Sequence, residues 1–370
     1  MITTRKILLV QLYSNGDCLY ATAVARQVKQ DFPGCHLTWA ISVSCKKIID
    51  GNPDVDAVIE VSEVPRDDEK AFRKLKRKFL AEKKHGKWHE VFVTHTMGNN
   101  QALYDGTIRG MIFRAYPNPV TVPVQPSLIL TREENSKVKV FAEKNNLSQF
   151  SNVILWEYAP QSGQSLLSFD FVMKLAERII QIPGTCVILS SANSFSGTPA
   201  IIDASSLSVR ENAALTHYCT LLIGCSSGIT WLSTSTAAKQ LPMIQLLDPQ
   251  AYYRNAPSVD FKRYNIPHNG LVELIRLDAD KIFSCVRTSI EKGISEAAKT
   301  FNEELPVQFN TTGKVVYNLL CYLQFKSIAR HYRITTSVYG RHPVFMKQFF
   351  LAFITFPFKL VANTWRKKFR

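Results

Sequence analysis

The chain has 370 residues, of which 46% are hydrophobic and 20% are charged, and its formal net charge at pH 7 is +15. This composition excludes a disordered or fibrous chain, and the length suits two globular domains of ordinary size. The excess of basic side chains indicates an anionic partner, such as nucleic acid, anionic lipid or a phosphorylated substrate. A basic protein without such a partner is the alternative.

The eight cysteines are scattered, and no two of them form a Cys-x-x-Cys pair. Such usage is typical of free thiols in a reducing cytoplasm, and the dispersed cysteines and histidines predict no metal site. The first apolar run, at 7–10, is too short for the core of a signal peptide. No apolar run reaches the roughly 18 residues that a membrane span needs. We therefore expect a cytoplasmic protein.

Strand-like and helix-like patterns alternate through the first half of the chain. An apolar stripe predicts a helix over 17–30, and strands are expected at 6–12, 36–43, 57–61 and 90–94. This order predicts a parallel sheet with right-handed crossovers. A proline-rich stretch then marks an irregular segment, and Thr131 with Glu134 predicts a capping box at the start of a helix over 131–145.

The alternation restarts in the second half, after a domain boundary that we place near 147–152. Strands are expected at 152–156, 185–190, 221–225 and 242–247, and helices at 169–181, 208–218 and 229–238. The sequence thus predicts an α/β protein with two Rossmann-like parallel-sheet domains that face a cleft. These domains span 1–148 and 149–300, followed by C-terminal helices at 301–343 and a basic, aromatic tail at 344–370.

Two segments could meet an anionic surface. The helix expected within 66–87 is heavily basic, which indicates either a solvated face or a surface for anionic lipid or an anionic acceptor. The tail at 344–370 holds an apolar aromatic run, interrupted by Pro357 and followed by a basic cluster. It is too short to span a bilayer, and we favour an interfacial anchor on an anionic membrane. A tail packed on the body of the protein or on a second subunit is the alternative.

The first junction of strand, turn and helix is Ser14-Asn15-Gly16-Asp17. Ligands of open α/β sheets bind at the carboxyl ends of the strands, so Asp17 is placed at the predicted cleft. Aspartate is also a preferred helix cap, but this position favours a role in catalysis. We take Asp17 as the candidate catalytic residue and Asn15 and Gly16 as substrate-binding candidates.

The second junction runs from Gly224 to Thr230 and places small residues and hydroxyls at the start of a helix. Unpaired backbone N–H groups and the helix dipole favour a phosphate there, and Gly228 lets the backbone come close to it. Plain helix capping would use the same residue types. The candidate substrate-binding residues of this junction are Ser226, Ser227, Gly228 and Thr230.

These two junctions carry a resemblance to a known family. The opening run Lys-Ile-Leu-Leu-Val, Gly16-Asp17, Phe32-Pro33-Gly34, the stretch 52–56 and the run 221–232 resemble glycosyltransferase family 9, the ADP-heptose:lipopolysaccharide heptosyltransferases. The resemblance covers roughly 5–60 and 150–250. It implies a GT-B fold, inverting transfer without an obligatory metal, and a sugar nucleotide held by the C-terminal domain. Asp17 would take the proton from the acceptor hydroxyl, and Ser227, Gly228 and Thr230 would cradle the diphosphate.

Three positions depart from the family. Ser226 stands where the family usually has Asp, Trp231 where it usually has His, and Gln164 where it commonly has Lys. The departures indicate a divergent member with a different donor, or an inactive one. We favour a different donor, because donation by backbone N–H groups survives changes of side chain. Contacts to the base and ribose are expected after the strand at 185–190, near Ser191 and Asn193.

The sequence therefore predicts an inverting glycosyltransferase that works without a cofactor on the inner face of the cytoplasmic membrane. It would move a sugar from a nucleotide-sugar donor to an anionic lipid-linked or surface glycan, of the lipopolysaccharide core or capsule type. The alternative is a non-catalytic protein that binds nucleotide sugar or glycan on the same scaffold. No nucleic-acid partner is expected, because the basic residues gather without a recognition motif.

Overall fold

The computed structural model describes residues 4–159, 167–248, 256–305 and 309–368. Its first sheet is entirely parallel, with the order β3-β2-β1-β4. The strands are β1 (Lys6–Val10), β2 (His36–Ser42), β3 (Ala57–Val61) and β4 (Glu90–Val93). The helices around this sheet are α1 (Asn15–Asp31), α2 (Glu69–Lys84) and α3 (Ile108–Ala115), with 3-10 turns η1 (Lys46–Ile49) and η2 (Gly98–Leu103).

The central strand β1 is buried on both faces, as strands of parallel sheets are. Ile7 and Leu9 pack with α1 on one face, and Leu8 packs on the other against Phe72 and Phe79 of α2. This arrangement explains why β1 reads as a continuous apolar run. It also places the end of β1, where α1 begins, at the carboxyl edge of the sheet.

The second sheet is also parallel, with the order β10-β9-β8-β5-β6-β7. Its strands are β5 (Asn152–Glu157), β6 (Thr185–Ser190), β7 (Ile201–Asp203), β8 (Leu221–Gly224), β9 (Met243–Leu246) and β10 (Leu271–Leu274). The helices of this half are α4 (Arg132–Lys144), α5 (Phe169–Ile179), α6 (Glu211–Leu215), α7 (Gly228–Leu232), α8 (Pro257–Tyr264), α9 (Ala279–Glu291) and α10 (Ile294–Phe301), with 3-10 turns η3 (Leu147–Gln149) and η4 (Thr216–Tyr218).

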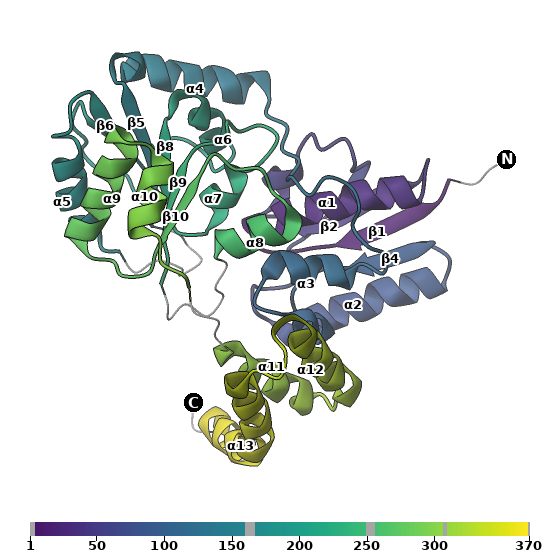
Figure 1. Cartoon of the computed structure of the whole chain (residues 1–370). Coiled ribbons are helices and arrows are strands. Elements are labelled where there is room, and N and C mark those ends of the chain that lie inside the picture. The colour runs from purple at the N-terminus through teal and green to yellow at the C-terminus, as the bar shows by residue number, and fades with distance from the viewer. Residues whose placement is uncertain (1–3, 160–166, 249–255, 306–308, 369–370) are drawn as a thin grey trace.

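One hydrophobic cluster runs through both halves of the molecule. It joins side chains of β1 and α1 to Trp231 and Leu232 of α7 and to Phe261 of α8. The two sheets lie side by side in Figure 1, with α7 and α8 between them. The junction of the two sheets is therefore packed with apolar side chains around α7 and α8.

Three C-terminal helices form a bundle below the first sheet: α11 (Asn310–Cys321), α12 (Phe325–Tyr339) and α13 (Pro343–Lys368). We call these helices the C-terminal bundle. It has its own core, in which Leu319 of α11 packs with Phe345 and Phe349 of α13. Ala102 of η2 belongs to the same core, so the bundle is attached to the first domain (Figure 1).

Asp105 joins three parts of the chain. Its Oδ2 lies 2.6 Å from a guanidinium nitrogen of Arg114 on α3 and 2.7 Å from one of Arg263 on α8. The hydroxyl of Tyr339, on α12, donates to the backbone oxygen of Asp105 at 2.6 Å. The first domain, α8 of the second half and the bundle therefore meet at one residue.

The eight strands expected from the sequence are confirmed, with bounds that differ by no more than two residues. The capping box at the start of α4 is confirmed as well, since Thr131 and Glu134 exchange both hydrogen bonds. The Lys137 ammonium of α4 pairs with Glu211 of α6 at 2.9 Å, so α4 packs with the other helices of the second half. The division of the chain near residue 149 stays a prediction.

Two expectations about helices were wrong. The helix expected over 229–238 ends at Leu232, because the hydroxyls of Ser233 and Thr234 donate to the preceding turn's carbonyls and compete with the helical ladder. The apolar tail is not interrupted at Pro357, because α13 continues through it. By length and composition, Pro343–Ala362 could cross a membrane, with a mean hydropathy of 1.5. This finding corrects the expectation that no apolar segment is long enough to span a bilayer.

Candidate active site

Asp17 lies in the first turn of α1, where the chain leaves β1. Its side chain is partly buried, and burial raises the pKa of the carboxyl to about 7 against the lowering effects of a backbone hydrogen bond at Ser14 and the positive charge of Arg66. The Arg66 guanidinium donates to Ser14 Oγ at 2.9 Å. Ser14, and not Asp17, is the N-cap residue of α1. A carboxyl of this pKa can accept a proton near neutral pH.

The second junction joins β8 to α7 through Cys225, Ser226 and Ser227. Ser226 has a positive φ of 56°, and Ser227 is the N-cap residue. Gln245 of β9 fixes this turn, because its Oε1 accepts from Ser226 N at 2.7 Å and from Thr230 Oγ1 at 3.1 Å. Gly228 is partly exposed, and a Cβ at that position would meet no atom within 4 Å. The loop is thus fixed by Gln245 on its buried side, and its backbone is accessible at Gly228.

Glu157 is a site residue that sequence reasoning missed. It ends β5, is buried, and accepts from the Ser227 hydroxyl and from the backbone N–H groups of Ile229 and Thr230 at 3.2 and 3.3 Å. Burial raises the pKa of the Glu157 carboxyl, and these hydrogen bonds oppose the rise. The carboxylate therefore takes two of the N–H groups that the sequence assigns to a diphosphate.

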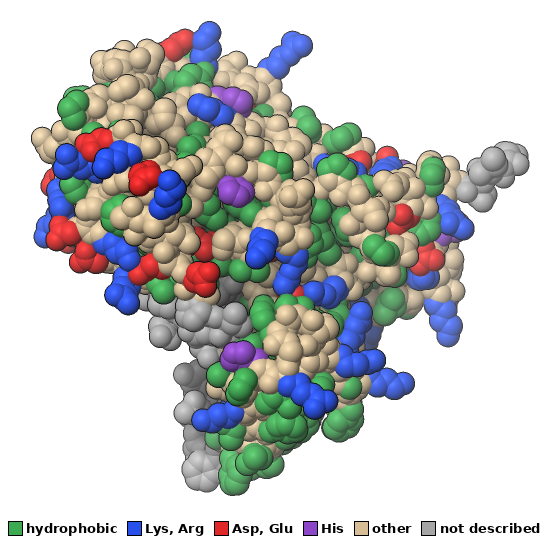
Figure 2. Space-filling model, viewed as in Figure 1, with side chains coloured by type: hydrophobic (Ala, Val, Ile, Leu, Met, Phe, Trp, Pro, Cys, Tyr) green, Lys and Arg blue, Asp and Glu red, His purple; other side chains and the backbone are tan. Residues whose placement is uncertain are grey.

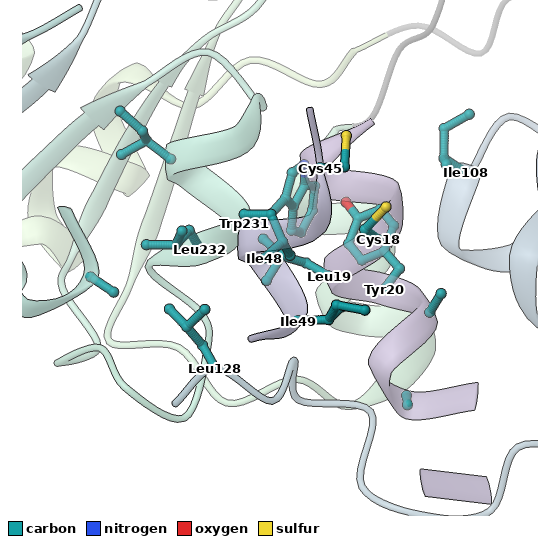
Figure 3. Close-up of a cluster of buried hydrophobic side chains, with 14 of the residues drawn as sticks. Cys18, Leu19, Tyr20, Cys45, Ile48, Ile49, Ile108, Leu128, Trp231 and Leu232 are labelled. Atoms are coloured by element: carbon teal, nitrogen blue, oxygen red, sulfur yellow. The ribbon is translucent and has the colours of Figure 1, made fainter. Parts of the chain in front are cut away.

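Trp231, in the helix of the second junction, contacts the first domain. Its ring lies 5.1 Å from that of Tyr20 on α1 and 6.0 Å from that of Phe261 on α8. A Cβ on Gly16 would lie 3.7 Å from Trp231 Cδ1. Figure 3 shows Trp231 beside Tyr20 and Ile48, where the two halves meet. The two junctions predicted from the sequence are therefore in contact through Gly16 and Trp231.

The remaining candidates are placed as follows. Ser191 and Asn193 form a local turn after β6, where Ser191 Oγ accepts from Asn193 N at 3.1 Å and lies 3.1 Å from the Tyr158 hydroxyl. Since β6 is next to β5, this turn shares the carboxyl edge with Glu157. Asn15 is the first residue of α1. Gln164 lies outside the described residues. No group of three or more His, Cys, Asp or Glu among the described residues could hold a metal ion.

No family model matches the chain, and no curated protein matches its sequence. Solved structures do match its fold. The glycosyl transferase family 9 structure from Veillonella parvula DSM 2008 is 14% identical, with 81% of this chain and 98% of that chain covered and a TM-score of 0.54. The E. coli ADP-heptose lps heptosyltransferase II is 13% identical, with 75% and 96% covered and a TM-score of 0.49.

The E. coli heptosyltransferase WaaC with ADP is 15% identical, with 78% and 99% of the two chains covered and a TM-score of 0.45. At such identities the likeness concerns the fold. Together with the two parallel sheets, the family 9 structure of TM-score 0.54 confirms the architecture that the sequence predicts. The chain has an α/β fold of the GT-B type, with two Rossmann-like domains.

Proposed function

We propose that the chain is an inverting glycosyltransferase that moves a sugar from a nucleotide-sugar donor to a glycan acceptor, with Asp17 as the general base. The observation that carries the proposal is the Asp17 carboxyl, whose pKa is raised to about 7 at the carboxyl end of β1. A base with a pKa near the working pH combines a useful ionised fraction with a strong pull on the acceptor proton. The likeness of the fold to a family 9 structure supports the same reaction.

The donor belongs to the second domain in this proposal. Its diphosphate lies over the exposed side of the loop at Gly228, where the backbone is open, with Ser226, Ser227 and Thr230 around it. Glu157 holds the loop from the buried side. Ser191, Asn193 and Gln164 are the proposed contacts to the rest of the donor, and Asn15 and Gly16 are those on the side of the acceptor. The proposed reaction uses neither a metal ion nor a cofactor.

The acceptor is an anionic lipid-linked or surface glycan, of the lipopolysaccharide core or capsule type. The protein is proposed to be cytoplasmic and peripheral on the inner face of the cytoplasmic membrane. The basic helix within 66–87 and the tail at 344–370 make this contact. Supporting features are the exposed apolar side chains of α13 and the basic face of α2.

A second candidate function is favoured by Glu157 and Trp231. A carboxylate already accepts from two N–H groups of α7, and an indole fills the junction of the two domains. Both features suit a non-catalytic protein that binds nucleotide sugar or glycan without transfer. Calorimetry that detects binding of a sugar nucleotide, with no transfer to any acceptor extract, would favour this candidate.

The test has two steps. A thermal-shift screen of nucleotides and sugar nucleotides ranks the donors, because binding stabilises the folded state by mass action. The best donor is then mixed with an acceptor extract, and release of nucleoside diphosphate is measured for wild type, Asp17→Asn and Glu63→Gln. Glu63 is an exposed acid of the same domain and serves as the matched control. We expect release by wild type and the control only, and an Asp17→Asn variant as active as wild type would refute the base assignment.

A further inference from the structure

Helix α13 is apolar on two opposite faces. Phe345, Phe349 and Ala352 are buried against the rest of the C-terminal bundle, and the Phe356 ring lies 5.5 Å from that of Tyr317 on α11. These side chains follow a spacing of three and four residues, which is one face of a helix. The opposite face exposes large apolar side chains beside Lys347: Ile354 is 64% exposed and Phe358 74% exposed. A helix that presents apolar side chains on both faces needs a second apolar environment.

The turn between α11 and α12 also exposes apolar side chains. Leu323, between the two helices, is 75% exposed, and Phe325, the first residue of α12, is 61% exposed. Their neighbour Tyr322 stacks with the guanidinium of Arg73, whose Cζ is 3.8 Å from the ring centroid. Arg73 belongs to α2, so the basic helix and the bundle adjoin. Figure 2 shows hydrophobic and basic side chains together over the bundle, at the bottom of the view.

The charge of this part of the chain decides between two occupants. Residues 305–370 include eleven Lys and Arg and no Asp or Glu. A second copy of the chain would bring like charge against like charge at this surface, which opposes association. An anionic lipid surface supplies both the apolar phase and the opposite charge.

We propose that the C-terminal bundle is a membrane-docking module that lies in the interfacial plane of an anionic bilayer, with α13 and the α11–α12 turn inserted together. This inference deepens the membrane contact of the proposed function and rests on it. Although α13 is long enough to cross, crossing would pull Phe345, Phe349 and Ala352 out of the bundle core. The part of α13 beyond Phe356 is only roughly 18 Å long, against the roughly 30 Å of a hydrocarbon core.

The test is flotation of the full chain with vesicles of phosphatidylcholine alone or mixed with phosphatidylglycerol. Two double variants remove exposed side chains, Ile354→Ser with Phe358→Ser and Leu323→Ser with Phe325→Ser. Val140→Ser is the control, because Val140 is a 61% exposed apolar residue on α4. We expect binding only to the anionic vesicles, at least about tenfold weaker in each double variant and unchanged in the control. Circular dichroism melting of every variant verifies that it is folded.

Two further measurements make the orientation falsifiable. Alkaline carbonate should release the wild type from vesicles, since an interfacial helix is peripheral, whereas retention would show that α13 crosses. Cys321 is exposed beside the turn and the other seven cysteines are buried, so a maleimide dye reports on the turn. Its emission should shift to shorter wavelength with anionic vesicles.

The proposal is overturned if the turn variant binds like wild type. It is also overturned if the same substitutions abolish self-association instead of vesicle binding. Vesicle binding is measured without donor or acceptor, so its failure and the failure of glycosyl transfer are separate results.

Discussion

The guanidinium of Arg109 and the carboxylate of Asp260 form an ion pair at 3.1 Å in which both side chains are almost completely buried. Arg109 belongs to α3 of the first domain and Asp260 to α8 of the second half. The same guanidinium stacks on the Tyr20 ring, 4.1 Å from its centroid, and donates to the Val124 carbonyl at 3.1 Å. The contact between the two halves thus contains a desolvated charge pair.

Removal of one partner of this pair should destabilise the protein strongly. Asp260→Leu leaves the Arg109 charge buried without its counter-ion, which costs about 3–5 kcal/mol of unfolding free energy. The double variant Arg109→Met with Asp260→Leu should recover much of this loss, because no unpaired charge remains. Urea denaturation of both single variants and the double variant measures the coupling. Additive losses in the double variant would contradict the prediction.

Asp17→Asn should affect stability and activity in opposite directions. The folded-state pKa of Asp17 is raised to about 7, so ionisation disfavours the folded state increasingly as pH rises from about 4 to 7. Asparagine has no charge to bury, so the variant should be more stable than wild type above pH 7, by no more than roughly 4 kcal/mol. The two proteins should converge near pH 4.

The same pKa predicts the pH dependence of turnover. The proposed base must be ionised, so kcat/KM of the wild type should rise through about pH 7 and then level off. Thermal unfolding followed from roughly pH 4 to pH 9 measures the stability curve, since this range includes both the unfolded-state and the folded-state pKa of Asp17. Nucleoside diphosphate release over the same range measures the activity curve. A flat activity profile would leave Asp17 without the role proposed for it.

Glu157→Gln should open the α7 loop to anions. The substitution removes a negative charge from the site where Ile229 N and Thr230 N point, so ADP and UDP should bind at least about fivefold more tightly. The amide cannot accept all of the carboxylate's hydrogen bonds, which should cost roughly 1–3 kcal/mol of stability. Calorimetry with each nucleotide measures the affinity. Glu177→Gln, an exposed acid on α5, is the control and should change neither quantity.

His95 should make the protein sensitive to acid. Its ring is buried beside Phe72, at 4.7 Å between ring centroids, and burial lowers its pKa to about 3. The unfolded chain takes up a proton near pH 6.5 and the folded chain does not, so unfolding free energy should fall as pH drops below 6.5, by about 1.4 kcal/mol per pH unit. His95→Leu should remove this part of the slope. Urea titrations at pH 7 and pH 5 compare the two proteins; parallel curves would refute the prediction.

The sequence predicts most of the fold because the strands of a doubly covered parallel sheet are continuous runs of Val, Ile and Leu. It also points to Asp17, which follows such a run after the short turn at 13–16. It does not reveal Glu157, which is the last residue of β5 but lies just after the strand expected from the sequence and reads as the start of a polar loop. The partners of Glu157 lie about 70 residues later, and only the pairing of β5 with β8 brings them together.

Other features of the site depend on contacts that no local pattern encodes. Trp231 reads as a departure from the family, and its packing against Tyr20 follows from the approach of the two halves. The length of α7 is set by two hydroxyls that bond back to the preceding turn. The proposed roles of Ser191 and Asn193 stay predictions, since their described hydrogen bonds are largely local.

The position of Asp105 has a mechanical consequence. Arg263 of α8 and Tyr339 of α12 hold the same residue, one through its carboxylate and one through its backbone oxygen. A movement that separates α8 from the first domain must therefore break the ion pair between Arg263 and Asp105. Asp105 is also the residue that accepts the hydrogen bond from Tyr339 of the bundle. A shift of Asp105 at either contact would therefore alter the other, which couples α8 to the bundle.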